Sequence, residues 1–198
     1  MKKIFLKIKD NYEKSCWIKK CREKGKCRIH STTCIKGSRY IQVKGDVSLG
    51  ENSKLLCWDK YMSGLKEQKL FPCIEIGDKF RATRNLTIQC ANRVIIGKNV
   101  LVASDVFIID YNHGLSPLFD NYLDEPLQTG EVCIGDGVWI GNNVIILPNT
   151  HIGKKTIVGA GSVVTKDIDE YCIAAGNPAK VLKKWDFDSN EWKSVKVM

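Results

Sequence analysis

The chain has 198 residues, of which 43% are hydrophobic, and it carries a formal net charge of +9 at pH 7. This length suits one domain with short appendages. No stretch approaches the ~20 consecutive apolar residues of a membrane-spanning helix, and the apolar run at residues 4–6 is too short for a signal peptide. We therefore expect a cytoplasmic protein.

The basic residues concentrate near the two ends of the chain, in residues 7–28 and 180–185. No RNA-binding aromatic motif and no recognition-helix pattern accompanies them, so we expect no nucleic-acid partner. Most of this charge fits a solvated helix face. An anionic cofactor, or peripheral contact with an anionic membrane, is the alternative.

The nine cysteines are spread through the chain, and no two of them form a CxxC pair. Only Cys16, Cys21, Cys27 and Cys34 cluster, together with His30, and their spacing is wider than that of typical zinc ligands. We expect reduced thiols, several of which pack as small hydrophobic residues, and no metal site. A structural zinc site in this cluster is the alternative.

Three segments follow one another along the chain. Residues 1–34 form a basic segment in which residues 2–24 are expected to be an amphipathic helix that ends at Gly25. Residues 35–170 carry a repeating apolar pattern, with loops inserted at about 57–73 and 109–133. Residues 171–198 form an extension that is expected to end in a short helix. The expected apolar side of the first helix consists of Ile4, Phe5, Ile8, Tyr12 and Trp17.

The repeating pattern has a period of six residues. A helix would return an apolar residue every ~3.6 positions and a strand every second position. Glycines and turn-forming pairs such as Asp136-Gly137 separate the branched residues, so each group of six predicts a short strand followed by a tight corner. Three such sides close a coil of about 18 residues, and stacked coils form a parallel β-helix. The branched residues of the clearest block are Ile134, Ile140, Ile146, Ile152, Val158 and Val164.

The string IGDGVWIGNNVIILPNTHIGKKTIVGAGSVVTKDI, followed by AAGNPAKVL, resembles the hexapeptide-repeat acyltransferases. It is most similar to their sugar and polysaccharide O-acetyltransferase branch. The resemblance covers roughly residues 74–184 and, more loosely, residues 35–56. It implies a mainly β fold with a left-handed parallel β-helix, a homotrimer with active sites between neighbouring subunits, and acetyl-CoA as the cosubstrate.

His113 is the candidate general base. It lies in a loop that interrupts the repeat, and histidine titrates near physiological pH. The resembling family places its catalytic histidine in this loop. Asp110 either orients His113 or caps a turn, and Asn112 is a candidate substrate ligand. His151, inside a regular repeat, is expected to be structural, and no role is assigned to His30.

Small residues and a tryptophan mark the expected cofactor side of the site. Trp139 offers a flat wall to a sugar ring or packs between subunits. By resemblance, the backbone N–H of Gly141 would hold the oxyanion, because the missing side chain lets the thioester approach. Gly159 and Ala160 are expected to leave a groove for the pantetheine arm. Clustered ammonium groups suit the phosphates of CoA, and the remaining expected cofactor contacts are Thr165, Lys166, Lys180 and Lys183.

The acceptor is constrained less tightly. In a galactoside-type register, Thr83 and Ala91 stand where the family carries an asparagine and an aspartate that help to bind the sugar. Thr83 is a candidate substrate residue, but neither side chain supplies the oxygens of a carboxylate. We therefore expect a glycan, a lipid-linked sugar or a nucleotide sugar rather than a simple galactoside.

The expected function is direct transfer of an acetyl group from acetyl-CoA to a sugar or glycan hydroxyl, without an acyl-enzyme. Three alternatives stay open: transfer to the amine of an amino nucleotide sugar, transfer from an acyl carrier protein, and a non-catalytic β-helix scaffold. Zinc carbonic anhydrases built on the same β-helix need histidine ligands at a coil interface, and His30 lies outside the clear repeats.

Overall fold

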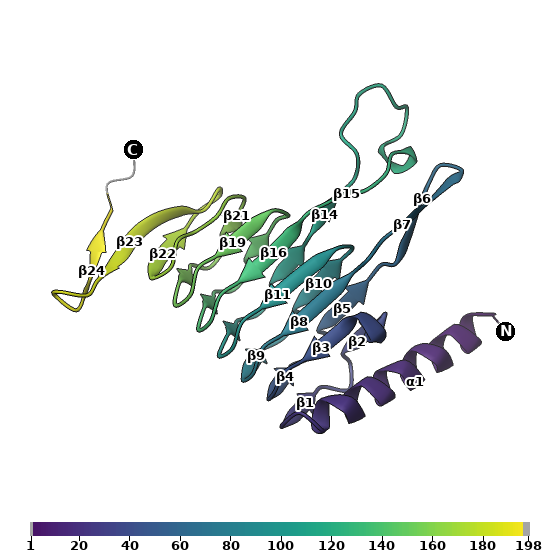
Figure 1. Cartoon of the computed structure of the whole chain (residues 1–198), viewed down its shortest axis with the longest axis horizontal. Coiled ribbons are helices and arrows are strands. Elements are labelled where there is room, and N and C mark those ends of the chain that lie inside the picture. Colours follow the sequence, from purple (N-terminus) through teal and green to yellow (C-terminus); the bar gives the residue numbers. More distant parts are fainter. Residues whose placement is uncertain (1, 196–198) are drawn as a thin grey trace.

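The computed structural model describes residues 2–195, and the side chains from residue 11 onward. Three sheets form the sides of a prism that runs from the N-terminal helix to the C-terminal strands (Figure 1). We refer to the 9-stranded, 6-stranded and 5-stranded sheets as sheets A, B and C. None of the described helices has the length and apolar content that crossing a bilayer requires.

Each full turn of the chain from β1 to β19 contributes one strand to each of the three sheets. Sheet A contains β1 (Cys27–Ile29), β4 (Val47–Leu49), β9 (Phe80–Ala82), β12 (Leu101–Val102), β17 (Trp139–Ile140), β20 (Ile157–Val158), β22 (Cys172–Ala175), β23 (Lys180–Asp186) and β24 (Glu191–Ser194). Sheet B contains β2 (Cys34–Lys36), β5 (Lys54–Cys57), β10 (Thr87–Cys90), β13 (Phe107–Ile109), β18 (Ile145–Ile146) and β21 (Val163–Val164). Sheet C contains β3 (Ile41–Val43), β8 (Cys73–Ile76), β11 (Arg93–Ile96), β16 (Glu131–Ile134) and β19 (Thr150–Ile152).

The six-residue period builds the interior of this prism. Ile140 pairs in register with Val158, and Ile146 pairs with Val164, so residues three repeats apart lie on top of each other. These four side chains are 0% exposed. Stacking the coils therefore buries a continuous apolar column, which one coil could not do alone. The parallel β-helix predicted from the sequence is confirmed.

The helix α1 (Lys2–Arg22) closes the N-terminal end of the prism. Trp17 is buried there, and its Nε1–H donates to the carbonyl oxygen of Ile41 at 3.0 Å. Cys21 packs beside it, and burial raises the pKa of its thiol to about 12. Tyr12, expected on the apolar side, is 71% exposed, which corrects that prediction. The other expected positions, Ile4, Phe5 and Ile8, have side chains outside the described ones.

Two boundaries differ from the sequence prediction. The first coil begins at Cys27 rather than at residue 35, because β1 already pairs with β4. The short C-terminal helix is wrong: β23 pairs antiparallel with β22, and β24 pairs with β23. The edge of sheet A offers backbone partners to this segment, and the rings of Trp185 and Trp192 meet edge to face with centroids 5.2 Å apart. Pairing with an existing sheet thus overrides local helix propensity.

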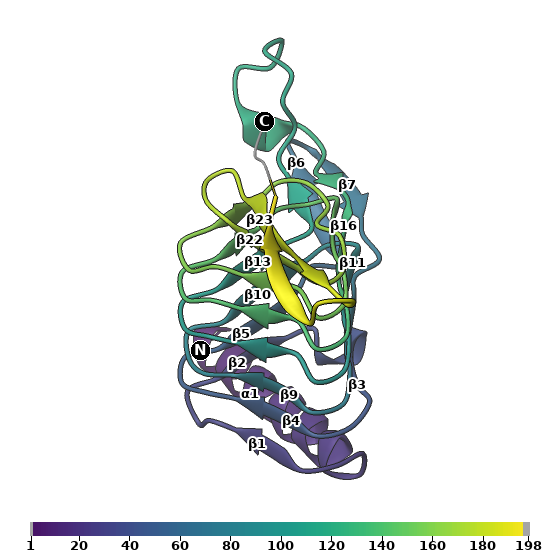
Figure 2. The same cartoon turned by 90° about the vertical axis from the view of Figure 1, so that its left-hand side faces the viewer.

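The two predicted insertions leave the prism at the same corner, between sheets B and C. The first is the hairpin β6 (Lys60–Ser63) and β7 (Lys66–Lys69). The second is a loop whose base is the short antiparallel pair β14 (Tyr111–Asn112) and β15 (Gln128–Thr129), and it carries the 3₁₀ helix η2 (Tyr122–Asp124). A second 3₁₀ helix, η1 (Ser38–Tyr40), precedes β3. Figures 1 and 2 show both insertions projecting side by side beyond the coils.

Candidate active site

The hairpin β6–β7 and the loop 110–130 are tied together by hydrogen bonds. The side chain of Gln68 donates to the carbonyl oxygen of Leu127 at 3.0 Å and accepts from its N–H at 2.7 Å. The hydroxyl of Ser63 donates to the carbonyl oxygen of Asp124 at 2.5 Å. Leu70, Ala91 and Leu127 form a small apolar cluster beneath. These contacts fix the position of the loop that carries His113.

A pocket of about 210 Å³ lies between the two insertions. Three aromatic side chains, a lysine, a leucine and His113 surround it. Aromatic faces with a few polar groups at their edges are typical of sites that bind sugar rings or other small molecules. The lining residues are Trp58, Lys60, Tyr61, Tyr111, His113 and Leu127.

His113 contacts Tyr61 from the other insertion. Its Nδ1 lies 3.3 Å from the phenolic oxygen of Tyr61, and the two rings meet edge to face with centroids 5.7 Å apart. The Tyr61 hydroxyl donates its hydrogen to the carbonyl oxygen of Leu123 at 2.9 Å. Since a phenol has one hydrogen to donate, its oxygen accepts the hydrogen on Nδ1 of His113. This chain of hydrogen bonds favours the tautomer in which Nε2 has the free lone pair.

Of the two roles expected for Asp110, the structure shows the one that holds a turn rather than the one that orients the histidine. Asp110 is 0% exposed, and its two carboxylate oxygens accept the backbone N–H groups of Ala91 and Asn92 at 2.7 and 2.9 Å. These amides lie at the corner between β10 and β11, in the preceding coil. Asp110 therefore anchors the start of the loop to the prism, and the hydrogen-bond partner at the His113 ring is Tyr61.

Tyr111 links the loop to sheet B. Its hydroxyl donates to Oε1 of Gln89 at 2.7 Å. Burial, together with the neighbouring Asp110 carboxylate, raises the pKa of Tyr111 to about 12. The ring is thus held as a neutral wall of the pocket. Asn112, expected to bind substrate, is exposed and pairs with Gln128 at the base of the loop.

Trp139 lies on the outer face of sheet A, away from this pocket. It pairs in register with Leu101 on one side and Ile157 on the other. The side chains of Trp139 and Leu101 are 49% and 45% exposed, so this face presents an uncovered apolar stripe. Thr83 lies at the end of β9, where its hydroxyl donates to the carbonyl oxygen of Val102 at 3.1 Å. The structure does not bring Thr83 to the pocket that contains His113.

The expected oxyanion donor needs a correction. The N–H of Gly141 donates to the carbonyl oxygen of Val158 at 2.8 Å, so it is already used in stacking the coils. A Cβ on Gly141 would lie 2.7 Å from the backbone nitrogen of Ala160, which explains why this corner requires glycine. The adjacent N–H of Asn142 has no hydrogen-bond partner among the described residues. That N–H is available to a ligand here.

Four of the expected cofactor residues, Gly141, Gly159, Ala160 and Lys180, lie at the corner between sheets A and B. The turn at residues 176–179 folds over this corner: Val163 N–H donates to Gly176 O at 3.0 Å and Ala179 N–H to Val163 O at 2.8 Å. It thereby places the exposed Lys180, paired with Ala175, beside the small residues Gly159 and Ala160. Lys183 follows on β23. Thr165 and Lys166 are exposed but follow β21, so they lie at the opposite corner, between sheets B and C, which corrects their expected place beside the other cofactor residues.

Within one chain, His113 and the cofactor corner lie at opposite ends of the strands of sheet B. Gly141 and Asn142 precede β18, whereas the loop with His113 follows β13, and these two strands pair in register. The two groups are therefore separated within one chain by the length of the sheet B strands. Among the described side chains, no cluster of three or more His, Cys, Asp or Glu could hold a metal ion.

Known proteins identify the family of this chain. The family model for the bacterial transferase hexapeptide (six repeats) matches residues 134–166. The putative lipopolysaccharide biosynthesis O-acetyl transferase WbbJ of Escherichia coli (strain K12) is 32% identical over 204 residues, which span 97% of this chain and 100% of that protein. The chain belongs to the hexapeptide-repeat acyltransferases.

Two further relatives agree with this assignment. Galactoside O-acetyltransferase of Escherichia coli (strain K12) is 40% identical over 116 residues, which span 56% of this chain and 54% of that protein. A galactoside acetyltransferase solved in complex with coenzyme A superposes with a TM-score of 0.55 at 32% identity, covering 75% of this chain and 70% of the other. The expected family, the left-handed β-helix and the class of acetyl-CoA-dependent O-acetyltransferases are confirmed.

Sequence reasoning missed the hairpin side of the pocket. Trp58 and Tyr61 belong to the insertion that was expected to be a plain loop, yet they provide two of its aromatic walls. The signal in the sequence is that Trp58 and Tyr61 are two of the three aromatic residues within the predicted insertion at residues 57–73. Only the structure shows that this insertion leaves the same corner as the loop with His113.

Proposed function

We propose that this hexapeptide-repeat acetyltransferase transfers the acetyl group of acetyl-CoA to a hydroxyl of a sugar within a glycan or glycan precursor, with Nε2 of His113 as the general base. The observation that carries the proposal is the hydrogen-bond chain from Leu123 O through the Tyr61 hydroxyl to Nδ1 of His113. In the neutral imidazole this chain puts the ring hydrogen on Nδ1 and the lone pair on Nε2, in a residue that lines an aromatic pocket. A base in this state is ready to accept a hydroxyl proton.

The reaction follows from this geometry. The acceptor oxygen attacks the thioester carbonyl while Nε2 takes the hydroxyl proton, so a tetrahedral oxyanion and an imidazolium form. The backbone N–H of Asn142, free among the described residues, is the proposed oxyanion donor. When the oxyanion collapses, the C–S bond breaks and the sulfur of CoA takes the proton from His113. The products are an acetyl ester and CoA.

We propose that the active unit is a homotrimer. His113 and the corner at Gly141 and Asn142 lie at opposite ends of sheet B in one chain, so a neighbouring copy must supply one of them. The exposed apolar stripe formed by Leu101 and Trp139 offers a surface for that contact. In this arrangement Trp139 forms a wall for the acceptor that the neighbour's His113 deprotonates.

The cofactor is proposed to lie along the corner between sheets A and B. The small residues Gly159 and Ala160 leave room for the pantetheine arm, and the ammonium groups of Lys180 and Lys183 contact the CoA phosphates as point charges. Thr165 and Lys166 follow β21 at the other end of sheet B and are not part of this proposed cofactor site. Because acetyl-CoA is an intracellular metabolite, the reaction is placed in the cytoplasm, and no metal is required by these steps.

The experiment that tests this function is a transfer assay with acetyl-CoA and a panel of acceptors: simple galactosides, nucleotide sugars, amino nucleotide sugars, lipid-linked sugars and oligosaccharides. Release of the CoA thiol reports turnover, and mass spectrometry with alkaline treatment distinguishes an ester from an amide. We expect an alkali-labile ester on a glycan or glycan precursor. An alkali-stable amide would instead support transfer to an amine, and no CoA binding would support a scaffold.

A further inference from the structure

The outer face of sheet A changes character along its length. At matched positions of successive strands it presents first Arg28, Ser48 and Arg81, and then Leu101, Trp139 and Ile157. The second group is the apolar stripe already assigned to the subunit contact and the acceptor wall. The first group lies toward α1 and has no part in the chemistry described so far. We call it the basic hollow, with Lys26, Asp46 and Lys79 at its border.

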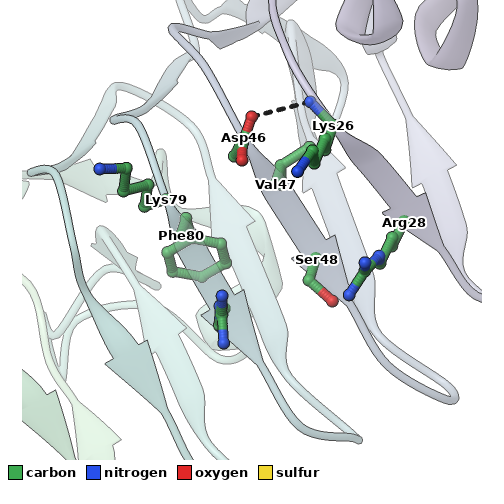
Figure 3. Close-up of a pocket in the computed structure, with 8 residues that line it drawn as sticks. Lys26, Arg28, Asp46, Val47, Ser48, Lys79 and Phe80 are labelled. Atoms are coloured by element: carbon green, nitrogen blue, oxygen red, sulfur yellow. Dashed lines mark hydrogen bonds between the residues drawn. The ribbon is translucent and has the colours of Figure 1, made fainter.

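The basic hollow is formed by a short side chain between two long ones. Ser48 is the short residue between two long ones, since Arg28 and Arg81 occupy the same position in the strands on either side. Neighbouring strands are ~4.8 Å apart, which separates the two arginine positions by about 10 Å with one small side chain between them. The space enclosed is about 120 Å³. Figure 3 shows Arg28 and Ser48 side by side in it, with Lys26, Asp46 and Lys79 along the edge where the strands begin.

The positive charge of the basic hollow is not compensated by the protein. Lys26, Arg28, Lys79 and Arg81 are all exposed, and none forms an ion pair with the side chains that the structure describes. Asp46 is the carboxylate in the lining, and one of its oxygens accepts the backbone N–H of Lys26 at 2.8 Å. The lining therefore has four cationic side chains and one carboxylate. An anion bound between the cationic side chains would reduce the repulsion among them.

We infer that the basic hollow is a binding site for a diphosphate group. Two guanidinium forks on opposite sides of a gap can each engage phosphate oxygens with paired hydrogen bonds, which ammonium groups cannot do. A diphosphate has enough length and charge to meet both forks at once. The hydroxyl of Ser48, half-buried between the two forks, donates to a bridging or terminal oxygen. Lys26 and Lys79 add point charges at the rim.

The position of the basic hollow connects it to the acceptor, and this part rests on the proposed function. Arg81 is two strands from Trp139 along the same face, a distance of about 10 Å. A sugar carried on a diphosphate would place its ring against Trp139 while the diphosphate lies between Arg28 and Arg81. The acceptor class is then a glycosyl diphosphate. Its carrier is either a soluble nucleoside or a membrane-bound polyprenyl chain, and both share the same diphosphate.

The direct test is calorimetric binding of inorganic pyrophosphate to the full chain with saturating CoA, so that the cofactor site is already filled. We expect Arg28→Gln with Arg81→Gln to weaken binding about a hundred-fold, or about ten-fold per lost fork. The matched control, Lys54→Gln with Lys69→Gln, removes the same charge from β5 and β7, outside sheet A, and should leave binding within about two-fold. Absence of binding to the wild-type protein, or equal loss in both double variants, would overturn the inference.

A second variant covers the case in which the double glutamine protein fails to fold. Arg28→Lys with Arg81→Lys keeps the charge but removes the forks, and it should weaken pyrophosphate binding about ten-fold. Unchanged affinity in this variant would contradict a fork-built site. A nucleoside diphosphate in solution and vesicles carrying a polyprenyl diphosphate then identify the carrier by competition with pyrophosphate. CoA binding to the wild-type protein is measured separately. If CoA does not bind, the proposed function is rejected, whereas the pyrophosphate measurement still decides whether the basic hollow binds a diphosphate.

Discussion

The hydroxyl of Tyr61 lies 3.3 Å from Nδ1 of His113 and, at the same time, 2.9 Å from the carbonyl oxygen of Leu123. The two rings come from different insertions of the β-helix, and Leu123 belongs to the same loop as His113. The carbonyl can only accept, so it fixes the direction of the whole chain of hydrogen bonds. Tyr61 thus positions the imidazole, and the hairpin β6–β7 is part of the proposed catalytic site.

Tyr61→Phe keeps the ring and removes this chain of hydrogen bonds. We expect kcat to fall about ten-fold, because the imidazole loses its preferred tautomer and orientation, while KM for acetyl-CoA stays within about two-fold. The pH–rate profile should change as well, which a purely structural role would not produce. Tyr122→Phe, at an exposed tyrosine of the same loop, is the control. Wild-type kcat and an unaltered pH profile in the Tyr61 variant would refute the positioning role.

Asp110→Asn separates anchoring from catalysis. The amide would present N–H hydrogens to one of the two backbone N–H groups that the carboxylate now accepts. We expect a loss of about 1–3 kcal/mol in the free energy of unfolding, with kcat reduced much less than in His113 variants. Denaturant unfolding and steady-state kinetics measure the two effects. A large fall in kcat without loss of stability would return Asp110 to the role of orienting the histidine.

Leu101→Asp tests the proposal that the active unit is a homotrimer. A carboxylate on the exposed apolar stripe would be desolvated in the interface, so we expect dissociation to monomers at micromolar concentration and loss of activity in parallel. Sedimentation analysis and the transfer assay report both properties. The control is Leu118→Asp, in the loop, where the side chain is 91% exposed. An active monomer would show that one chain suffices.

Most of the fold could be predicted because each side of a coil takes six residues, so the buried apolar residue recurs with that period in the sequence. Ile29 lies six residues before Ile35, so the period already covers the first coil. Because Lys26 and Arg28 are basic, the sequence prediction places this stretch in the basic segment instead. The C-terminal strands were missed for another reason. Their partner is the edge of β22, which local sequence does not reveal.

Site residues could be predicted only where a chemically suitable side chain and a break in the repeat occur in the same segment. His113 is predicted because it is a histidine in a break of the repeat, where the resembling family places its catalytic histidine. Its contact with Tyr61 joins residues 52 positions apart, and nothing in the sequence says that two insertions share a corner. Gly141 was assigned from its missing side chain, whereas the use of its N–H depends on the next coil. Which backbone N–H groups are used between coils depends on how the coils stack, so the sequence of one coil does not reveal it.

The general base is tested most directly by the turnover rate of His113→Ala with acetyl-CoA and the best acceptor from the panel. His151→Ala, an exposed histidine on β19 in sheet C, is the matched control and should retain wild-type turnover. We predict that His113→Ala keeps the trimer and CoA binding but loses about 10²–10⁴-fold in kcat. Turnover close to that of the wild type in the His113 variant would contradict the assignment of His113 as the general base.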